Sequence, residues 1–315
     1  MPRITRKLCS IFTLFSVCLV GFTFHYKWLN DSQDKVPSSG HDEFLVSQMN
    51  RKELLKSVCQ QGKLRKPFGR INQFVANRLF VEQKDKFLIC EVPKVECTNW
   101  KRIILLLKLN LSTDEVHFEH EAVHETSVLK RLSDFPAAQQ RMMLDNYTKV
   151  MFTRHPFQRI VSAFREKFLH RERYYTNIAN IIKSQVRMVN FSGNVTFKEF
   201  VNYTVQQTPT NLDIHWMPMH LLCDPCNINY NVLGKFETLK RDSDQVLKLI
   251  GAPSYLKYPE LKHYNEARTD TNRPGLAICL DTNIVDKYFS TLPLKLVERL
   301  TKLYKYDFGL FGYSY

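Results

Sequence analysis

The sequence is short of acidic residues and has neither an internal repeat nor a glycine-rich loop of the form GxxxxGK[ST]. The missing loop argues against an ordinary ATP-binding site. Its 31 Asp and Glu stand against 45 Lys and Arg, and the resulting net charge of +14 suits an anionic partner: nucleic acid, an anionic membrane, an acidic small molecule or a polysaccharide. With 44% hydrophobic and 12% aromatic residues, the 315-residue chain has the composition of a folded protein and excludes a disordered one.

The N-terminal region contains one long uncharged run, "LCSIFTLFSVCLVGFTF", at residues 8–24. Because basic residues precede it, we expect residues 1–7 to form a cytosolic tail and the run to form a transmembrane signal-anchor. A cleaved signal peptide is the alternative, but no small-x-small cleavage pattern follows the run. We interpret the polar residues 25–50 as a stem and residues 51–315 as a lumenal domain.

Two further features fit an exported body, which argues against a nucleic-acid partner. Six Asn-x-Ser/Thr sites could accept glycans: Asn30, Asn110, Asn146, Asn190, Asn194 and Asn202. Six cysteines outside the apolar run could form disulfides in an oxidising lumen, in pairings that the sequence leaves open: Cys59, Cys90, Cys97, Cys223, Cys226 and Cys279. The single CxxC, in "CDPC", is weak evidence for zinc without a second pair, so a disulfide is expected there.

Apolar runs and helical patterns alternate from about residue 80. The predicted strands are 86–92, 147–153 and 230–239, and the predicted helices are 99–111, 155–170, 241–251 and 292–308. Residues 171–210 are expected to be irregular. Because strands alternate with helices, the sequence predicts an α/β fold with a P-loop-like parallel sheet flanked by helices.

The segment "VPKVECTNWKR" reads as a strand, a turn and a helix. Such a corner points backbone N–H groups and the positive end of the helix dipole at one place, which favours an anion. Lys94 adds a positive charge there, Thr98 a hydroxyl donor and Asn99 an amide. The alternative is a strand-to-helix corner with surface lysines.

A second basic segment, "TRHPFQRIVSAFREKF", follows the next predicted strand. Arg154 lies just after that strand, where its guanidinium could hold a phosphate bidentately. Ser162 lies two turns along the following helix and could add a hydrogen bond. The alternative is a solvated basic helix face.

Together these two segments resemble the nucleotide-binding motifs of the Golgi carbohydrate sulfotransferases, which bind the 5′-phosphosulfate and the 3′-phosphate of PAPS. The resemblance runs from about residue 80 to the C-terminus and continues in "DIHW", "LCDPC", "GKFETL" and "YKYDFGLFGYS". "DIHW", "GAP" and "EART" are most similar to the N-acetylgalactosamine 4-O-sulfotransferases, and "HWMPM" is similar to the dermatan branch.

The resemblance implies a sulfotransferase fold and transfer of sulfate from PAPS, without a metal, to a glycan hydroxyl. It favours C-4 of N-acetylgalactosamine on glycoprotein N-glycans or on chondroitin or dermatan. It also implies a single-pass type II protein of the Golgi membrane, and leaves the oligomeric state open. The implied PAPS-binding residues are Pro93, Lys94, Val95, Glu96, Cys97, Thr98, Asn99, Arg154, His155, Pro156, Phe157, Gln158, Arg159, Ile160, Val161 and Ser162.

For catalysis, Lys94 is expected to stabilise charge on the oxygen that leaves sulfur. The acceptor hydroxyl needs a general base. His124 is the first choice, because the family keeps a histidine between the two motifs, and His215 of "DIHW" is the second. The carboxylate of Glu166 is a further alternative.

Two positions depart from the family pattern. Glu96 replaces an Ala or Gly, and His155 replaces an Asp or Glu. Because a carboxylate repels phosphate, we expect the Glu96 side chain to point away from the nucleotide and to pair with Lys101 or Arg102.

Two other functions remain open from the sequence. A Golgi glycosyltransferase could hold Mn²⁺ through Asp-x-Asp, and "DSD" at 242–244 has those letters. The segment opens a predicted helix, however, where acidic residues suit the helix dipole. A non-catalytic protein that binds acidic glycans would explain the basic charge, but not the two phosphate motifs.

Overall fold

The computed structural model describes residues 40–66, 71–111, 123, 126–169, 173–187, 192–259 and 282–315. It divides into two compact units, Met1–Ser47 and Gln48–Tyr315, and the second contains the sheet and the candidate site. The predicted tail, the predicted anchor and residues 25–39 of the predicted stem lie outside the described residues. Within the described residues, no helix combines the length and the apolar character that crossing a bilayer requires.

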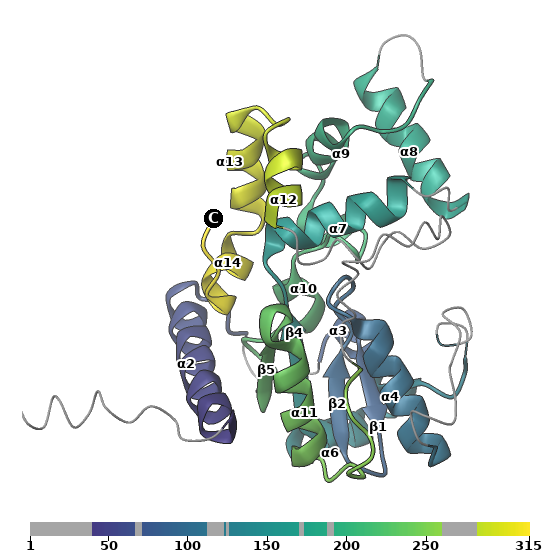
Figure 1. Cartoon of the computed structure of the whole chain (residues 1–315), viewed down its shortest axis with the longest axis vertical. Helices are drawn as coiled ribbons and strands as arrows, with labels where there is room; N and C mark the ends of the chain where they lie inside the picture. The colour runs from purple at the N-terminus through teal and green to yellow at the C-terminus, as the bar shows by residue number, and fades with distance from the viewer. Residues whose placement is uncertain are drawn as a thin grey trace, which may run out of the picture. The chain divides into compact units, whose positions relative to one another are not determined.

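The second unit is built on a mixed sheet in the order β3-β1-β2-β4-β5 (Figure 1). Its strands are β1 Leu79–Glu82, β2 Phe87–Cys90, β3 Lys130–Arg131, β4 Thr148–Thr153 and β5 Val232–Lys235. The predicted strands are confirmed as β2, β4 and β5, which run parallel. The expectation of a wholly parallel sheet is wrong, because β1 pairs antiparallel with both β2 and β3.

Each parallel strand is followed by a helix, as the sequence predicts: α4 Cys97–Leu109 after β2, α7 Pro156–Leu169 after β4 and α11 Leu239–Leu249 after β5. The other described helices are α2 Gly40–Gln61, α3 Gln73–Ala76, α6 Ala137–Asn146, α8 Arg173–Val186, α9 Phe197–Thr204, α10 Met219–Cys223, α12 Thr282–Phe289, α13 Leu294–Leu303 and α14 Lys305–Phe311. Residues 40–50, part of the predicted stem, are therefore helical.

Two sequence predictions about helices are wrong. Residues 171–210 are not irregular, because they contain α8 and α9. The single helix predicted at 292–308 is two helices, α13 and α14, that meet at Tyr304. The Tyr304 hydroxyl donates to the backbone oxygen of Trp216, so this break anchors the chain next to "DIHW".

The core has two aromatic centres. Trp100 of α4 packs against Phe152 of β4 and Tyr258, with ring centroids 5.6 and 5.7 Å apart. A second group joins α7, α9 and the "DIHW" segment: Phe164, Phe168, Phe197, Phe200 and Trp216. Each fully buried Phe contributes about 1.5–3 kcal/mol to folding, so this second group fixes the segment that carries His215.

Two disulfides tie distant parts of the chain together. Cys59 of α2 bonds to Cys226, and Cys90 at the end of β2 bonds to Cys223 of α10. The cysteines of "CDPC" therefore have separate partners, rather than bonding to each other. Cys97 is free, and Cys279 lies outside the described residues.

Removing the Cys90–Cys223 bond should destabilise the fold. The bond closes a loop of 133 residues, and loss of a native disulfide costs about 2–5 kcal/mol. We expect the Cys90→Ala/Cys223→Ala variant to lose a free energy of unfolding in that range, measured by urea denaturation. Cys97→Ala is the matched control, because it removes a thiol that forms no bond. An equal loss in both variants would show that the disulfide contributes little.

Candidate active site

The loop between β2 and α4 has an unusual backbone. Lys94 has φ +70° and Glu96, the N-cap of α4, has φ +59°, so two non-glycine residues adopt the left-handed conformation. Such strain persists only where the surroundings enforce it, and it often marks a functional loop. The predicted strand, turn and helix are thus confirmed.

The two predicted nucleotide motifs lie side by side, because β2 and β4 are parallel neighbours and both motifs follow the carboxyl ends of their strands. Arg154 is buried and donates from Nη1 to the backbone oxygen of Lys94 over 3.0 Å. Its guanidinium also stacks over the ring of Phe236, 4.1 Å from the centroid. The ammonium of Lys94 pairs with Glu166 of α7.

Arg159 has a different role from the one the sequence predicts. Its Nε donates to the oxygen of Pro93 (2.9 Å), Nη1 to that of Met217 (2.6 Å) and Nη2 to that of Ile214 (2.7 Å). The side chain is 1% exposed. We therefore assign it a structural role, in which it ties the Lys94 loop to the "DIHW" segment.

The remaining predicted PAPS-binding residues fall into two groups. The first group has seven apolar side chains. Cys97 is half-buried, and the other six are buried: Pro93, Val95, Pro156, Phe157, Ile160 and Val161. The half-buried polar side chains are Thr98, Asn99, Gln158 and Ser162. These donors, together with Lys94 and Arg154, suit a nucleotide that carries two phosphate groups.

His155 links the second motif to the C-terminal segment. Its Nδ1 accepts from the backbone N–H of Phe157 (3.2 Å), so Nε2 donates to the oxygen of Ser314 (2.8 Å). Burial lowers the pKa of His155, which favours the neutral ring that these bonds require. His155 is therefore uncharged.

One of the two partners expected for Glu96 pairs with a different carboxylate. Its expected partner Lys101 instead pairs with Glu91 at 2.6 Å, and the Glu96 carboxylate accepts from the side-chain amide of Asn99 at 3.2 Å. Burial raises the pKa of Glu96, while the charges of Lys94, Arg154 and Arg102 oppose the rise. The carboxylate thus lies in the field of Lys94, Arg154 and Arg102, the other expected partner, while its direction relative to a bound nucleotide stays a prediction.

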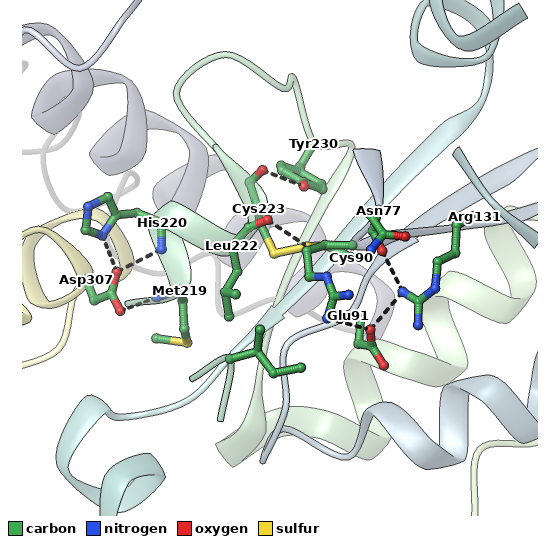
Figure 2. The surroundings of a disulfide bond; sticks show 12 residues. Asn77, Cys90, Glu91, Arg131, Met219, His220, Leu222, Cys223, Tyr230 and Asp307 are labelled. Atoms are coloured by element: carbon green, nitrogen blue, oxygen red, sulfur yellow. Dashed lines mark hydrogen bonds and ion pairs between the residues drawn. A yellow bond between two sulfur atoms is a disulfide. The ribbon is translucent and has the colours of Figure 1, made fainter. Parts of the chain in front are cut away.

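Glu91 is a buried anion that the sequence did not single out. It pairs with Lys101, with Arg131 at 2.9 Å and with Arg78 at 3.1 Å. These three cations overcome burial and lower the pKa of Glu91 to about 2. Figure 2 shows its carboxylate facing Arg131, directly after the Cys90–Cys223 bond, so the end of β2 is fixed just before the Lys94 loop.

His215 has the geometry of a general base. Its Nδ1 lies 2.7 Å from Oδ1 of Asp213, and because a carboxylate only accepts, Nδ1 carries the proton and Nε2 the lone pair. The Tyr175 hydroxyl donates to the other carboxylate oxygen over 3.3 Å and lies 2.9 Å from Nδ1. Burial lowers the pKa of His215, Asp213 opposes this, and the charges of Lys167 and Lys94 lower it further. The neutral base therefore lies near Lys94.

Of the three predicted bases, the structure brings His215 and Glu166 to the Lys94 loop, whereas His124 lies outside the described residues. Sequence reasoning missed Asp213 and Tyr175 as partners of His215. Asp213 could have been found, because it lies two residues before the histidine. Tyr175 gave no signal, because it comes from a segment expected to be irregular.

The "DSD" segment has structural partners. Asp242 is fully buried and accepts from Arg51 and Thr238, both at 2.6 Å, and Asp244 pairs with Lys240 at 2.8 Å. Its carboxylates thus hold α2 and α11 in place, as the helix-start interpretation favours.

Comparison with known proteins agrees with these motifs. A model described as "Sulfotransferase family" matches residues 77–314. The chain belongs to the sulfotransferase family. It is 35% identical to human carbohydrate sulfotransferase 9 over 85% of its own length and 60% of that protein, and 35% identical to mouse carbohydrate sulfotransferase 8 over 85% and 64%. It is 32% identical to zebrafish carbohydrate sulfotransferase 14 over 86% and 72%.

The chain thus spans somewhat less than two thirds of the first two relatives. No solved structure matches it.

Removing the Glu96 charge should strengthen anion binding. We expect Glu96→Gln to bind adenosine 3′,5′-bisphosphate about tenfold more tightly at neutral pH, because one negative charge leaves a partly buried cluster of cations. Since the carboxyl pKa is raised, wild-type affinity should approach that of the variant as the pH falls and Glu96 is protonated. Calorimetry across pH measures both. Glu298→Gln is the charge-matched control, because Glu298 is exposed on α13. Equal affinities in wild type and Glu96→Gln at every pH would contradict this placement.

Proposed function

We propose that this sulfotransferase-family chain transfers sulfate from PAPS to a glycan hydroxyl. The favoured acceptor position is C-4 of N-acetylgalactosamine, on glycoprotein N-glycans or on chondroitin or dermatan. One observation supports this most: two basic motifs at the carboxyl ends of adjacent parallel strands meet beside a histidine that an aspartate orients. The names of the relatives supply the glycan acceptor class.

Each reacting group has a defined task in this proposal. His215 accepts the proton of the acceptor hydroxyl at Nε2 as the oxygen attacks sulfur, and the bond from sulfur to the phosphate oxygen breaks. Lys94 stabilises the negative charge on that leaving oxygen. Arg154 and Ser162 hold the 3′-phosphate, while Thr98 and Asn99 hold the 5′-phosphate.

The carboxylate of Glu166 balances the charge of the Lys94 ammonium group. When the anionic donor binds, its phosphates compete with Glu166 for the ammonium group. Lys167 also contacts Glu166, at 3.0 Å, and so remains as a partner for the carboxylate. Lys94 can therefore contact the donor while Glu166 keeps Lys167 as its partner.

We also propose that the protein is a single-pass type II protein of the Golgi membrane, held by residues 8–24. Two disulfides support an oxidising compartment. The sequons at Asn146 and Asn194, whose asparagines are exposed, fit the same lumenal placement.

Lys94→Ala should abolish most of the transfer. We expect kcat to fall about 10²–10³-fold, the usual loss for one group that stabilises a developing oxyanion. The measurement is transfer of labelled sulfate from PAPS to a panel of desulfated glycans. The control is Lys248→Ala, because Lys248 is exposed near the far end of α11. Transfer by Lys94→Ala at the wild-type rate would refute the assignment of Lys94.

His215 should set the acidic limb of the pH profile. Because its pKa is lowered, kcat should stay constant as the pH falls until a value below the usual histidine range, where the base becomes protonated. His215→Gln should lower kcat about 10²–10⁴-fold and remove that limb. Asp213→Asn should also lower kcat, because it no longer fixes the proton on Nδ1. An unchanged limb in His215→Gln would assign the base elsewhere.

A further inference from the structure

A pocket lies at the end of β2 that is opposite to the Lys94 loop. Three parts of the chain line it: Asp85 of the turn before β2, Asn110 at the end of α4, and Tyr255 in the segment after α11. Its volume of about 140 Å³ is roughly ten times what one water molecule needs. The pocket is therefore large enough to take a sugar ring.

Asn110 brings a possible sugar to this pocket by a covalent route. It begins the sequence "NLS", an acceptor for N-linked glycans, and it is exposed. Its φ of +56° ends α4, because asparagine tolerates the left-handed conformation. Its side-chain oxygen accepts from Nζ of Lys84 over 3.4 Å, whereas Nδ2 makes no hydrogen bond to the described residues. The atom that carries a glycan is thus available at the edge of the pocket.

The lining offers two kinds of contact to a sugar ring. Tyr255 is 50% exposed and presents an aromatic surface, which suits the apolar C–H face of a sugar. Asp85 lines the same pocket, and its buried Oδ2 accepts no hydrogen bond from the described residues. Burial and the nearby Glu82 raise the pKa of Asp85, so its charge is poorly compensated. A buried acceptor without a donor is unusual, and a sugar hydroxyl or the N–H of an N-acetyl group would supply one.

We propose that Asn110 carries an N-linked glycan and that the first N-acetylglucosamine of this glycan binds in the pocket, against Tyr255 and Asp85. In the attachment step, a bond forms between Nδ2 and C1 of the sugar, and the bond from C1 to the diphosphate of a lipid-linked oligosaccharide breaks. The lipid diphosphate leaves with that electron pair, and the amide gives up one proton. This inference rests on the lumenal placement in the proposed function and is independent of the transfer reaction.

The bound sugar would join segments that lie far apart in the sequence. α4 begins directly after Glu96, in the Lys94 loop, and ends at Asn110. The wall that contains Tyr255 follows α11. The sugar therefore holds the far end of the helix that carries the first phosphate motif, and its removal should lower the thermal stability of the fold.

The test compares two digests of the full chain, expressed in eukaryotic cells that attach only oligomannose glycans. Endoglycosidase H leaves one N-acetylglucosamine on each asparagine, whereas peptide-N-glycosidase F removes the whole glycan and leaves aspartate. The form that keeps one sugar should melt about 2–4 °C higher, the shift expected for one aromatic contact in a domain of this size. Mass spectrometry should find the glycan on the peptide that contains Asn110.

Two variants assign this difference to the pocket. Ser112→Ala keeps Asn110 but destroys the acceptor sequence, so the difference between the digests should disappear, and Ser112→Thr should preserve it. Tyr255→Ala keeps the glycan and removes the aromatic surface, so the difference should disappear here too, although one digest still forms aspartate at position 110. Because Tyr255 is half exposed, this variant should fold normally.

Asn146→Gln is the matched control at another sequon. Asn146 is exposed, and its Nδ2 donates to the backbone oxygen of Met142 in its own helix, α6, over 2.8 Å. Loss of a glycan at this position should leave the difference between the two digests unchanged.

Glycan occupancy separates this inference from the placement on which it rests. If the peptides of Asn146 and Asn194 carry glycans and that of Asn110 does not, the inference is wrong and the lumenal placement stands. Equal melting temperatures of the two digests, in a chain that is glycosylated at Asn110, overturn the binding of the sugar in the pocket. If every sequon is unmodified, the lumenal placement fails together with the inference.

Discussion

The guanidinium group of Arg159 holds the candidate active site together. A buried charge is costly unless its donors are all satisfied, and here each nitrogen bonds to a backbone oxygen: those of Pro93, Ile214 and Met217. The first oxygen directly precedes Lys94, and the other two bracket His215. One side chain of α7 therefore sets the distance between the group that stabilises the leaving oxygen and the group that removes the proton. Losing it would leave three inward-facing carbonyls without this donor, at about 1–3 kcal/mol for each one that stays buried and unsatisfied.

The charge balance around Arg154 explains how the two departures from the family pattern coexist. Both Glu96 and His155 lie close enough for Arg154 to affect their pKa values. The resemblance noted in the sequence would place a carboxylate at position 155, beside this arginine. Here the neutral His155 takes that position and bonds to Ser314. Glu96 brings a carboxylate near the same arginine from the other motif. The acidic residue gained and the acidic residue lost therefore both affect the charge around Arg154.

What the sequence could predict is local. The order of β2, α4, β4, α7, β5 and α11 follows from apolar runs, and both phosphate motifs consist of neighbours along the chain. β1 escaped detection because four residues in a hairpin give too short a pattern, and α8 because its many polar residues hide the buried side chains of Tyr175 and Ile182. The pairing of Glu91 with Arg131, and of each CDPC cysteine with its partner, depends on contacts between residues far apart in sequence, which no local pattern encodes.

The prediction of active-site residues was limited in the same way. Lys94 and Arg154 could be matched to a phosphate because each lies at the end of a strand, and adjacent parallel strands end together. Arg159 has the same residue type and lies in the same motif, but its helical position turns it toward the core. The sequence shows its charge but not the direction of its side chain, and that direction separates a ligand contact from a structural one.

The two disulfides also set a problem for the chain while it folds. Cys223 and Cys226 are three residues apart, and their correct partners are Cys90 and Cys59. Each of the two could form first with the wrong partner, and repair needs a thiolate to attack the mispaired bond. Burial raises the pKa of Cys97 to about 11, so in the finished fold this thiol stays protonated and does not attack either bond. Among the described residues, the one free thiol is therefore held in its protonated, unreactive form in the finished fold.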